Sequence, residues 1–174
     1  MNGSATFVLF RLLHILSGAL WVGGAIVIAA FIMPSIQAIG PAGGPMMAQL
    51  GKVRRFPIYM MAASVLTLLS GLLIYWMDGQ SFGTSWMAST PGRVFGLGGL
   101  LAIIAGVLGM TMMSPAGKRM GEISAAIQSG GKPPTPEQIS EMQRLQARVQ
   151  KVGPVVLTLI LLATTCMAVA RYTG

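Results

Sequence analysis

Four apolar stretches, each about as long as the hydrocarbon core of a bilayer is thick, dominate this chain. They run over residues of about 7–33, 56–77, 94–113 and 154–172. A helix rises about 1.5 Å per residue, so roughly 20 apolar residues cross a core of about 30 Å. Because lipid offers no hydrogen-bond partners, each stretch must satisfy its own backbone groups, which a helix does. The sequence therefore predicts an all-α fold, a four-transmembrane-helix bundle forming a single domain over residues 1–174.

The scarcity of charge supports a membrane protein. Only 9% of the residues are charged and 53% are hydrophobic, whereas a soluble domain carries about 25% charged residues. Such a chain cannot cover a surface that faces water, so the lipid bilayer is the expected surrounding. The first stretch is too long for the apolar part of a signal peptide and no basic segment precedes it. We therefore expect it to stay as a helix of the mature protein.

The basic residues are divided unevenly between the two sides of the predicted bundle. The loops after the first and third helices carry Lys52, Arg54, Arg55, Lys118, Arg119, Lys132, Arg144, Arg148 and Lys151. The opposite side carries only Arg11, Arg93 and Arg171. This positive-inside pattern predicts cytoplasmic basic loops and both termini outside, in the inner membrane of a bacterium. The expected partners of the loops are anionic lipid headgroups rather than nucleic acid.

The cytoplasmic loop over residues 114–153 contains a signal for an additional helix. Its Thr135-Pro136-Glu137-Gln138 run combines an N-cap, a proline in the first turn and a capping-box glutamine. Apolar residues then recur at helical spacing, which predicts an amphipathic helix over about 136–151. Two placements are open: along the membrane surface, or running on into the fourth helix through a bend at Gly153-Pro154.

Small residues are concentrated in the third stretch. Five glycines in or just before it, expected broadly along one side, are Gly92, Gly96, Gly99, Gly106 and Gly109. Close helix packing is the favoured explanation, and pairing of this face between two copies would form a homo-oligomer. A slot for a flat cofactor is the alternative. The single cysteine, Cys166, is expected to be a small packing residue.

The first stretch contains the single histidine of the chain, His14, three residues after Arg11. Helical spacing puts on one face Arg11, His14, Gly18, Trp21 and Ala25. Gly18 is expected to leave open space beside the imidazole. In one interpretation His14 hydrogen-bonds a serine or threonine across the bundle while Arg11 reaches the headgroups. In the other, His14 is an axial ligand of heme iron and Arg11 pairs with a propionate.

The charges on the predicted outer side favour a dianionic ligand near His14. Arg11, Arg93 and Arg171 lie at outer helix ends, and such a set suits a tetrapyrrole or a quinone headgroup. The alternative is that each arginine anchors its own helix end. The four acidic residues are expected in loops, which disfavours a carboxylate proton relay within the membrane. One histidine excludes both a bis-histidine heme within one chain and a paired-histidine zinc site.

The first two helices resemble a group of small bacterial membrane proteins. Arg11-Leu12-Leu13-His14 followed by Trp21-Val22-Gly23-Gly24 resembles the first helix of CopD-like copper-resistance domains and HemJ-type protoporphyrinogen IX oxidases. The segment from Ser64 to Gly71 is similar to the second helix of the HemJ type. The four-helix layout and the basic stretch before the fourth helix also fit.

The resemblance implies roles for three residues. His14 matches the histidine that the HemJ type uses for heme, and Trp21 matches the tryptophan of the motif. Arg93 stands where the HemJ type has a functional lysine at the start of the third helix. Arginine keeps the charge but does not readily release a proton, so the departure favours carboxylate binding over porphyrinogen oxidation.

These observations lead to one main functional hypothesis and two alternatives. We expect a protein that binds heme b through His14, with Arg11, Gly18, Trp21 and Arg93 in the site. It would act in electron transfer or in oxidation of a lipophilic substrate such as a quinone or a porphyrinogen-like molecule, which would make it a membrane oxidoreductase. One alternative is a cofactor-free membrane subunit or scaffold, and the other is a component of copper transport or resistance.

Overall fold

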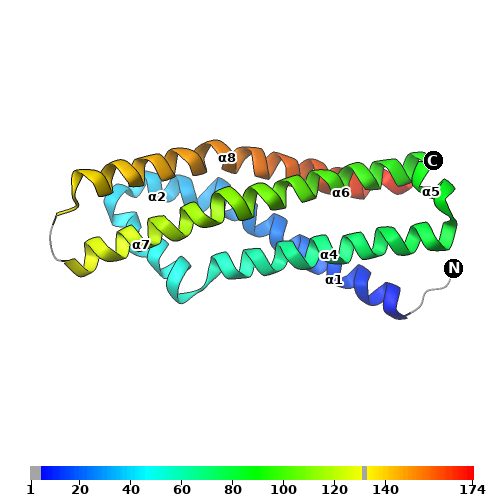
Figure 1. Cartoon of the computed structure of the whole chain (residues 1–174), viewed down its shortest axis with the longest axis horizontal. Coiled ribbons are helices and arrows are strands. Elements are labelled where there is room, and N and C mark those ends of the chain that lie inside the picture. Colours follow the sequence, from blue (N-terminus) through cyan, green and yellow to red (C-terminus); the bar gives the residue numbers. More distant parts are fainter. Residues whose placement is uncertain (1–4, 131–132) are drawn as a thin grey trace.

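The computed structural model of the chain is an elongated helical bundle (Figure 1). It describes residues 5–130 and 133–174, except for the side chains at positions 41, 42, 48, 52 and 84. Within these residues the structure contains helices and no strand. Four of the helical segments are long and apolar enough to cross a membrane. The all-α fold with four candidate membrane helices, predicted from the sequence, is confirmed. Lys132 and the Lys52 side chain lie outside the described residues.

The first membrane segment is longer than predicted. Helix α1 (Ala5–Val27) continues through a π turn, η1 (Ile28–Ile32), into α2 (Met33–Ile39). We expected the helix to end at Pro34, because proline lacks an N–H and crowds the preceding turn. The widened π turn lies just before this proline, where such a disruption has to be absorbed. Gly40 ends α2 instead, in a backbone conformation with a φ of 65° that glycine adopts readily.

A short connection leads to the second membrane segment. It consists of η2 (Gly40–Gly43), α3 (Gly44–Ala48) and the π turn η3 (Gln49–Val53). Helix α4 (Phe56–Phe82) follows and ends at Gly83. The helix was predicted to end at residue 77, which put Asp78 in a loop. Asp78 instead lies on the last turns of α4.

The third and fourth segments also exceed their predicted lengths. After α5 (Thr84–Ala88), helix α6 (Thr90–Leu108) passes through a π turn, η4 (Gly109–Met113), into α7 (Ser114–Gly130). Helix α8 (Pro136–Val169) then runs back to η5 (Ala170–Tyr172). The capping box at Thr135 and Gln138 is present, as predicted. Glu122, expected outside any helix, therefore lies on α7, whereas Glu137 and Glu141 lie on α8 within the helix predicted over 136–151.

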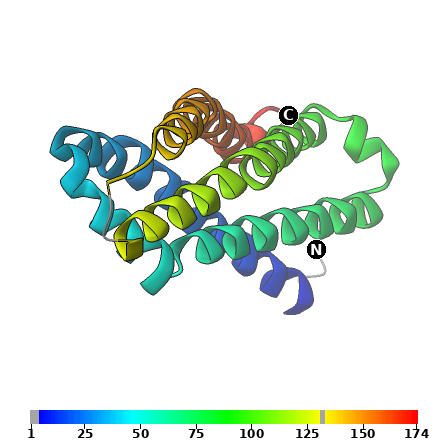
Figure 2. The ribbon, with the colours of Figure 1, turned by 60° about the vertical axis from the view of Figure 1, so that its left-hand side comes forward.

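The amphipathic helix predicted over 136–151 is the first half of α8. It continues through Pro154 into the fourth membrane segment, which is the second of the two placements that the sequence left open. Proline is tolerated inside membrane helices, because neighbouring groups can satisfy the carbonyl that loses its partner. The loop predicted over 114–153 is thus a helical hairpin of α7 and the first half of α8 (Figure 2).

The bundle is assembled from two closely packed pairs, α1 with α4 and α6 with α8. All four helices contribute to a central core, whose buried members are Trp21, Ala63, Ala105, Val156 and Ile160. Many large apolar side chains remain exposed on the outside, among them Leu9, Leu69 and Leu100. Exposed apolar side chains of this kind are expected where lipid is the solvent. The start of α1 and the C-terminus lie at the end opposite the hairpin (Figure 1).

The hairpin has a separate hydrophobic core. Ala116 and Ile123 on α7 and Leu145 on α8 are buried against one another. The segment Thr90–Gly130 has 41 residues; its length of about 60 Å is twice that of the hydrocarbon core. The hairpin therefore extends beyond the hydrocarbon. The guanidinium of Arg119 joins the two helices of the hairpin. Its Nε donates to Glu141 Oε1 on α8 (2.9 Å), and its Nη2 donates to Oε2 of the same residue (3.1 Å).

This second core predicts how the hairpin responds to mutation. Leu145 is buried in it, so Leu145→Ala should lower the free energy of unfolding by about 2–5 kcal/mol. Ile139→Ala, at an exposed position on the same helix, is the matched control and should have a clearly smaller effect. Hydrogen exchange of hairpin amides in detergent measures the change. Equal effects of the two substitutions would contradict a packed core between α7 and α8.

Candidate functional site

A polar seam joins α1 to α4 inside the otherwise apolar bundle. We define the α1–α4 seam as His14 and the buried polar residues Ser17, Ser64, Thr67 and Ser70. The three α4 members recur every third residue and so share one helix face. The Thr67 hydroxyl donates to Ser17 Oγ (2.9 Å), which donates in turn to the carbonyl of Leu13 (2.6 Å). The seam thus connects the two helices through side chains about 50 residues apart in sequence.

The imidazole of His14 is oriented by a hydrogen bond to the backbone of α4. Its Nδ1 lies 2.8 Å from the carbonyl oxygen of Thr67. A carbonyl oxygen only accepts hydrogen bonds, so Nδ1 must carry the proton in this arrangement. Ser70 Oγ lies 3.5 Å from the same nitrogen. In the neutral ring, Nε2 is therefore the nitrogen with the free lone pair.

Gly71 on α4 makes room for this imidazole. A Cβ atom at Gly71 would lie 2.7 Å from Cε1 of His14 and 3.0 Å from Nδ1. Both distances are shorter than normal contacts, so any other residue would displace the ring. Gly18 does not have the role that we expected for it. A Cβ there would meet Thr67 Cγ2 at 3.5 Å, so the space next to Gly18 is occupied by Thr67 and is not open beside the imidazole.

Trp21 belongs to the centre of the bundle. It is 7% exposed and packs with Ala63, Ala105 and other core residues. It lies two helical turns, about 10 Å, further along α1 than His14. Its ring therefore packs in the central core, at the level where Ser64 of the seam follows Ala63 on α4.

The arginines named from the sequence all lie at the end of the bundle that holds the termini. Arg11 is on α1, Arg93 is on the first turn of α6, and Arg171 is on η5, which contacts α6. All three side chains are exposed. Arg11 interacts electrostatically with Asp78 on α4. This pairing was not predicted, because Asp78 was expected in a loop. Among the described side chains, this end therefore carries the three guanidinium groups and the carboxylate of Asp78.

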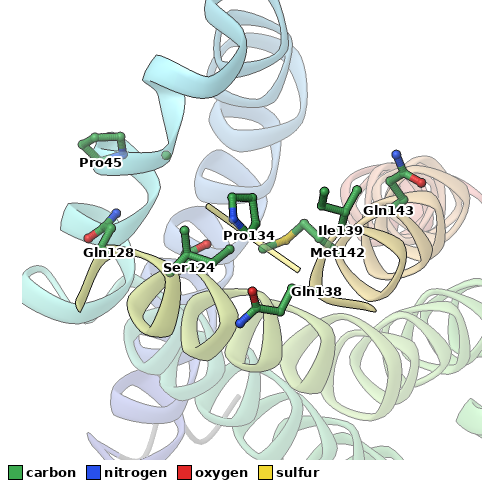
Figure 3. Close-up of a pocket in the computed structure, with 10 residues that line it drawn as sticks. Pro45, Ser124, Gln128, Pro134, Gln138, Ile139, Met142 and Gln143 are labelled. Atoms are coloured by element: carbon green, nitrogen blue, oxygen red, sulfur yellow. The ribbon is translucent and has the colours of Figure 1, made fainter. Parts of the chain in front are cut away.

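Two surface hollows of the described part of the chain lie away from His14. One, of about 430 Å³, is bounded by residues of α3, α7 and α8, including Ser124, Gln128 and Met142 (Figure 3). The other, of about 400 Å³, lies between the start of α4 and α7. Both are at the hairpin end of the bundle. Neither includes a residue of the α1–α4 seam.

The glycines of α6 face several neighbours rather than one. A Cβ on Gly92 would collide with the backbone of Trp86, and one on Gly96 would press on the Tyr75 hydroxyl. Gly99 has open space around it. Close packing therefore accounts for Gly92 and Gly96, whereas Gly99 faces no described neighbour.

The described residues offer no ready-made metal cage. Among them, no group of three or more His, Cys, Asp or Glu side chains could hold an ion. Cys166 is half-buried, and its Cβ lies against the position that a side chain on Gly98 would occupy. This agrees with a packing role. A metal bound here would need most of its ligands from another molecule, as heme iron has from its porphyrin.

Sequence reasoning identified His14 but missed the groups that orient it. Ser64, Thr67 and Ser70 form a polar stripe at helical spacing within an apolar helix. Ser17 lies three residues after His14. This pattern was a visible signal that α4 faces the histidine. The role of Gly71 depends on how deeply the two helices pack, which the sequence does not state.

No protein-family model, curated protein or solved structure matches this chain. The resemblance to the CopD-like and HemJ-type groups stays a prediction from the motif in the first helix.

The seam predicts the tautomer of the histidine. Because His14 is the single histidine of the chain, ¹⁵N-histidine labelling reports on it alone when the purification tag contains no histidine. We expect the neutral ring to carry its proton on Nδ1 rather than on Nε2, since Nδ1 donates to the Thr67 carbonyl. Gly71→Ala should disturb this spectrum, whereas Gly99→Ala, with open space around it, should not. A ring protonated on Nε2 alone would contradict the geometry.

Proposed function

We propose that this protein binds heme b through His14 and acts in electron transfer or in oxidation of a lipophilic substrate in the membrane. The observation that carries the proposal is the hydrogen bond from Nδ1 of His14 to the Thr67 carbonyl. Metal-binding histidines usually donate the second ring N–H in this way, which sets the tautomer and raises the basicity of the other nitrogen. Nε2 is then the nitrogen that suits iron.

The residues around His14 fit such a ligand in donor chemistry. Arg11 lies one turn from His14 towards the end that holds the termini, and Arg93 begins α6 at the same end. Guanidinium groups pair well with carboxylates such as the propionates of heme. Bound heme would supply reversible one-electron chemistry at its iron. The chain's own contribution is to orient the imidazole, hold the ring proton on Nδ1 and pair the carboxylates with guanidinium groups.

The membrane supplies the second reactant in this proposal. A quinone dissolved in the bilayer can reach the exposed apolar faces of α1 and α4 and can accept or deliver electrons. A porphyrinogen-like substrate would be recognised through its carboxylates by the same arginines. We place the protein in the bacterial inner membrane, with the hairpin in the cytoplasm, because the basic side chains are concentrated there.

One observation favours a second candidate, a cofactor-free membrane subunit or scaffold. In the described part of the chain, each buried side-chain nitrogen or oxygen has a hydrogen-bond partner. The α1–α4 seam could therefore serve only to hold two helices together, as polar side chains do in lipid. His14 would then be a structural residue with its Nε2 directed to no ligand.

The visible spectrum of the protein in mild detergent tests the proposal. We expect a Soret band that shifts on reduction by dithionite and is lost in His14→Ala, because the axial ligand is removed. Gly71→Ala should shift or weaken the band, since it moves the imidazole without deleting it. Gly99→Ala is the control and should match the wild type. A protein that stays colourless when heme is supplied during expression would leave the scaffold as the better account.

A further inference from the structure

A set of exposed basic side chains lies near the base of the hairpin. We define the basic collar as the exposed residues Arg54, Arg55, Lys118, Arg144, Arg148 and Lys151. The first two precede α4, Lys118 is on the first turns of α7, and the others are on α8. Val149 on α8 packs with the core that contains Ala116 on α7, and Lys118 lines a groove together with Pro57 at the start of α4. The starts of α4 and α7 and the middle of α8 are therefore neighbours. Both ion pairs found among the described residues are made by Arg119 instead.

The level of the collar matches the headgroup layer of a bilayer. The apolar part of the third segment ends at Met113, and Lys118 follows five residues later. That separation is about 7 Å along a helix. The headgroup region adds about 5–7 Å on each side of the hydrocarbon. Lys118 therefore lies where lipid phosphates lie.

An open groove interrupts the collar beside Lys118. It has a volume of about 400 Å³ and lies between the first turns of α4 and of α7. Its α4 wall includes Ile58 and Met61, which are 58% and 47% exposed. Its α7 wall includes Gly117 and Gly121, and a Cβ at either glycine would meet no atom within 4 Å. The α4 wall is thus apolar, and the α7 wall has open space at its two glycines.

The charges at the groove favour an anion. Lys118 and Glu122 both line it. Glu122 is engaged by Arg119, with 3.4 Å between Oε2 and Nη1. Lys118 makes no ion pair with any described residue. The groove thus offers the Lys118 ammonium at the level of the headgroups and the apolar side chains of Ile58 and Met61 beside it. These groups are complementary to a phospholipid, which has a phosphate at one end and acyl chains at the other.

We infer that the groove between α4 and α7 binds one anionic phospholipid. The Lys118 ammonium would contact its phosphate, and the part of an acyl chain nearest the headgroup would lie against Ile58 and Met61. This site differs from diffuse attraction of lipids to the collar, because it uses one lysine and one shaped surface. It is independent of heme binding, since no residue of the α1–α4 seam takes part.

Native mass spectrometry of the full-length protein tests this inference. The protein is extracted in mild detergent from vesicles with equal amounts of phosphatidylglycerol and phosphatidylcholine, and the retained lipids are counted. We expect one retained phosphatidylglycerol. Lys118→Gln should reduce the retained fraction about tenfold, as loss of a charged hydrogen bond does. Lys151→Gln, a collar residue that does not line the groove, is the matched control and should stay close to wild type.

A second pair of variants tests the shape of the groove without changing charge. Gly117→Leu fills it and should also remove the lipid, whereas Gly99→Leu on α6 adds the same side chain in open space and should not. Equal losses in Lys118→Gln and Lys151→Gln would overturn the site in favour of diffuse attraction. Equal retention of the two lipids, no retained lipid, or a retained second copy of the chain in place of lipid would overturn it as well.

Discussion

The absence of water from the hydrocarbon core is the constraint on which this structure depends. Backbone groups in lipid must be satisfied within the protein, so the chain crosses only as helices. The same requirement applies to each polar side chain inside the bundle. Ser17 and Thr67 meet it by bonding to one another, and His14 meets it on the backbone of α4. The α1–α4 seam is thus a direct consequence of the solvent in which the protein resides.

The hydrogen bond of His14 can serve packing and ligand binding together. Donation from Nδ1 stabilises the contact between α1 and α4, and it also leaves Nε2 as the basic nitrogen. Gly71 allows this because the imidazole lies where its side chain would be. The scaffold and the heme-binding hypotheses therefore share the same local geometry. They differ in whether a ligand binds at Nε2 of His14.

The two halves of helix α8 are suited to different solvents, the first to water and the second to lipid. Its first half follows the rules of a soluble protein, with Leu145 buried in the hairpin core and Glu141 paired with Arg119. Its second half carries exposed apolar side chains such as Leu161. The basic collar marks the change between them. Hydropathy alone ended the third helix at Met113, because it measures the apolar length rather than the point where helical hydrogen bonding stops.

Local patterns were sufficient for the number of apolar helices and for the capping box at Thr135, because both depend on residues close together in sequence. The sequence also singled out His14 through its chemistry. Only the tertiary structure decided which groups surround it. Thr67 is 53 residues away, and the depth at which α1 packs on α4 determines that Gly71, rather than Gly18, accommodates the imidazole. Such contacts depend on how whole helix faces fit together, which no short stretch of sequence encodes.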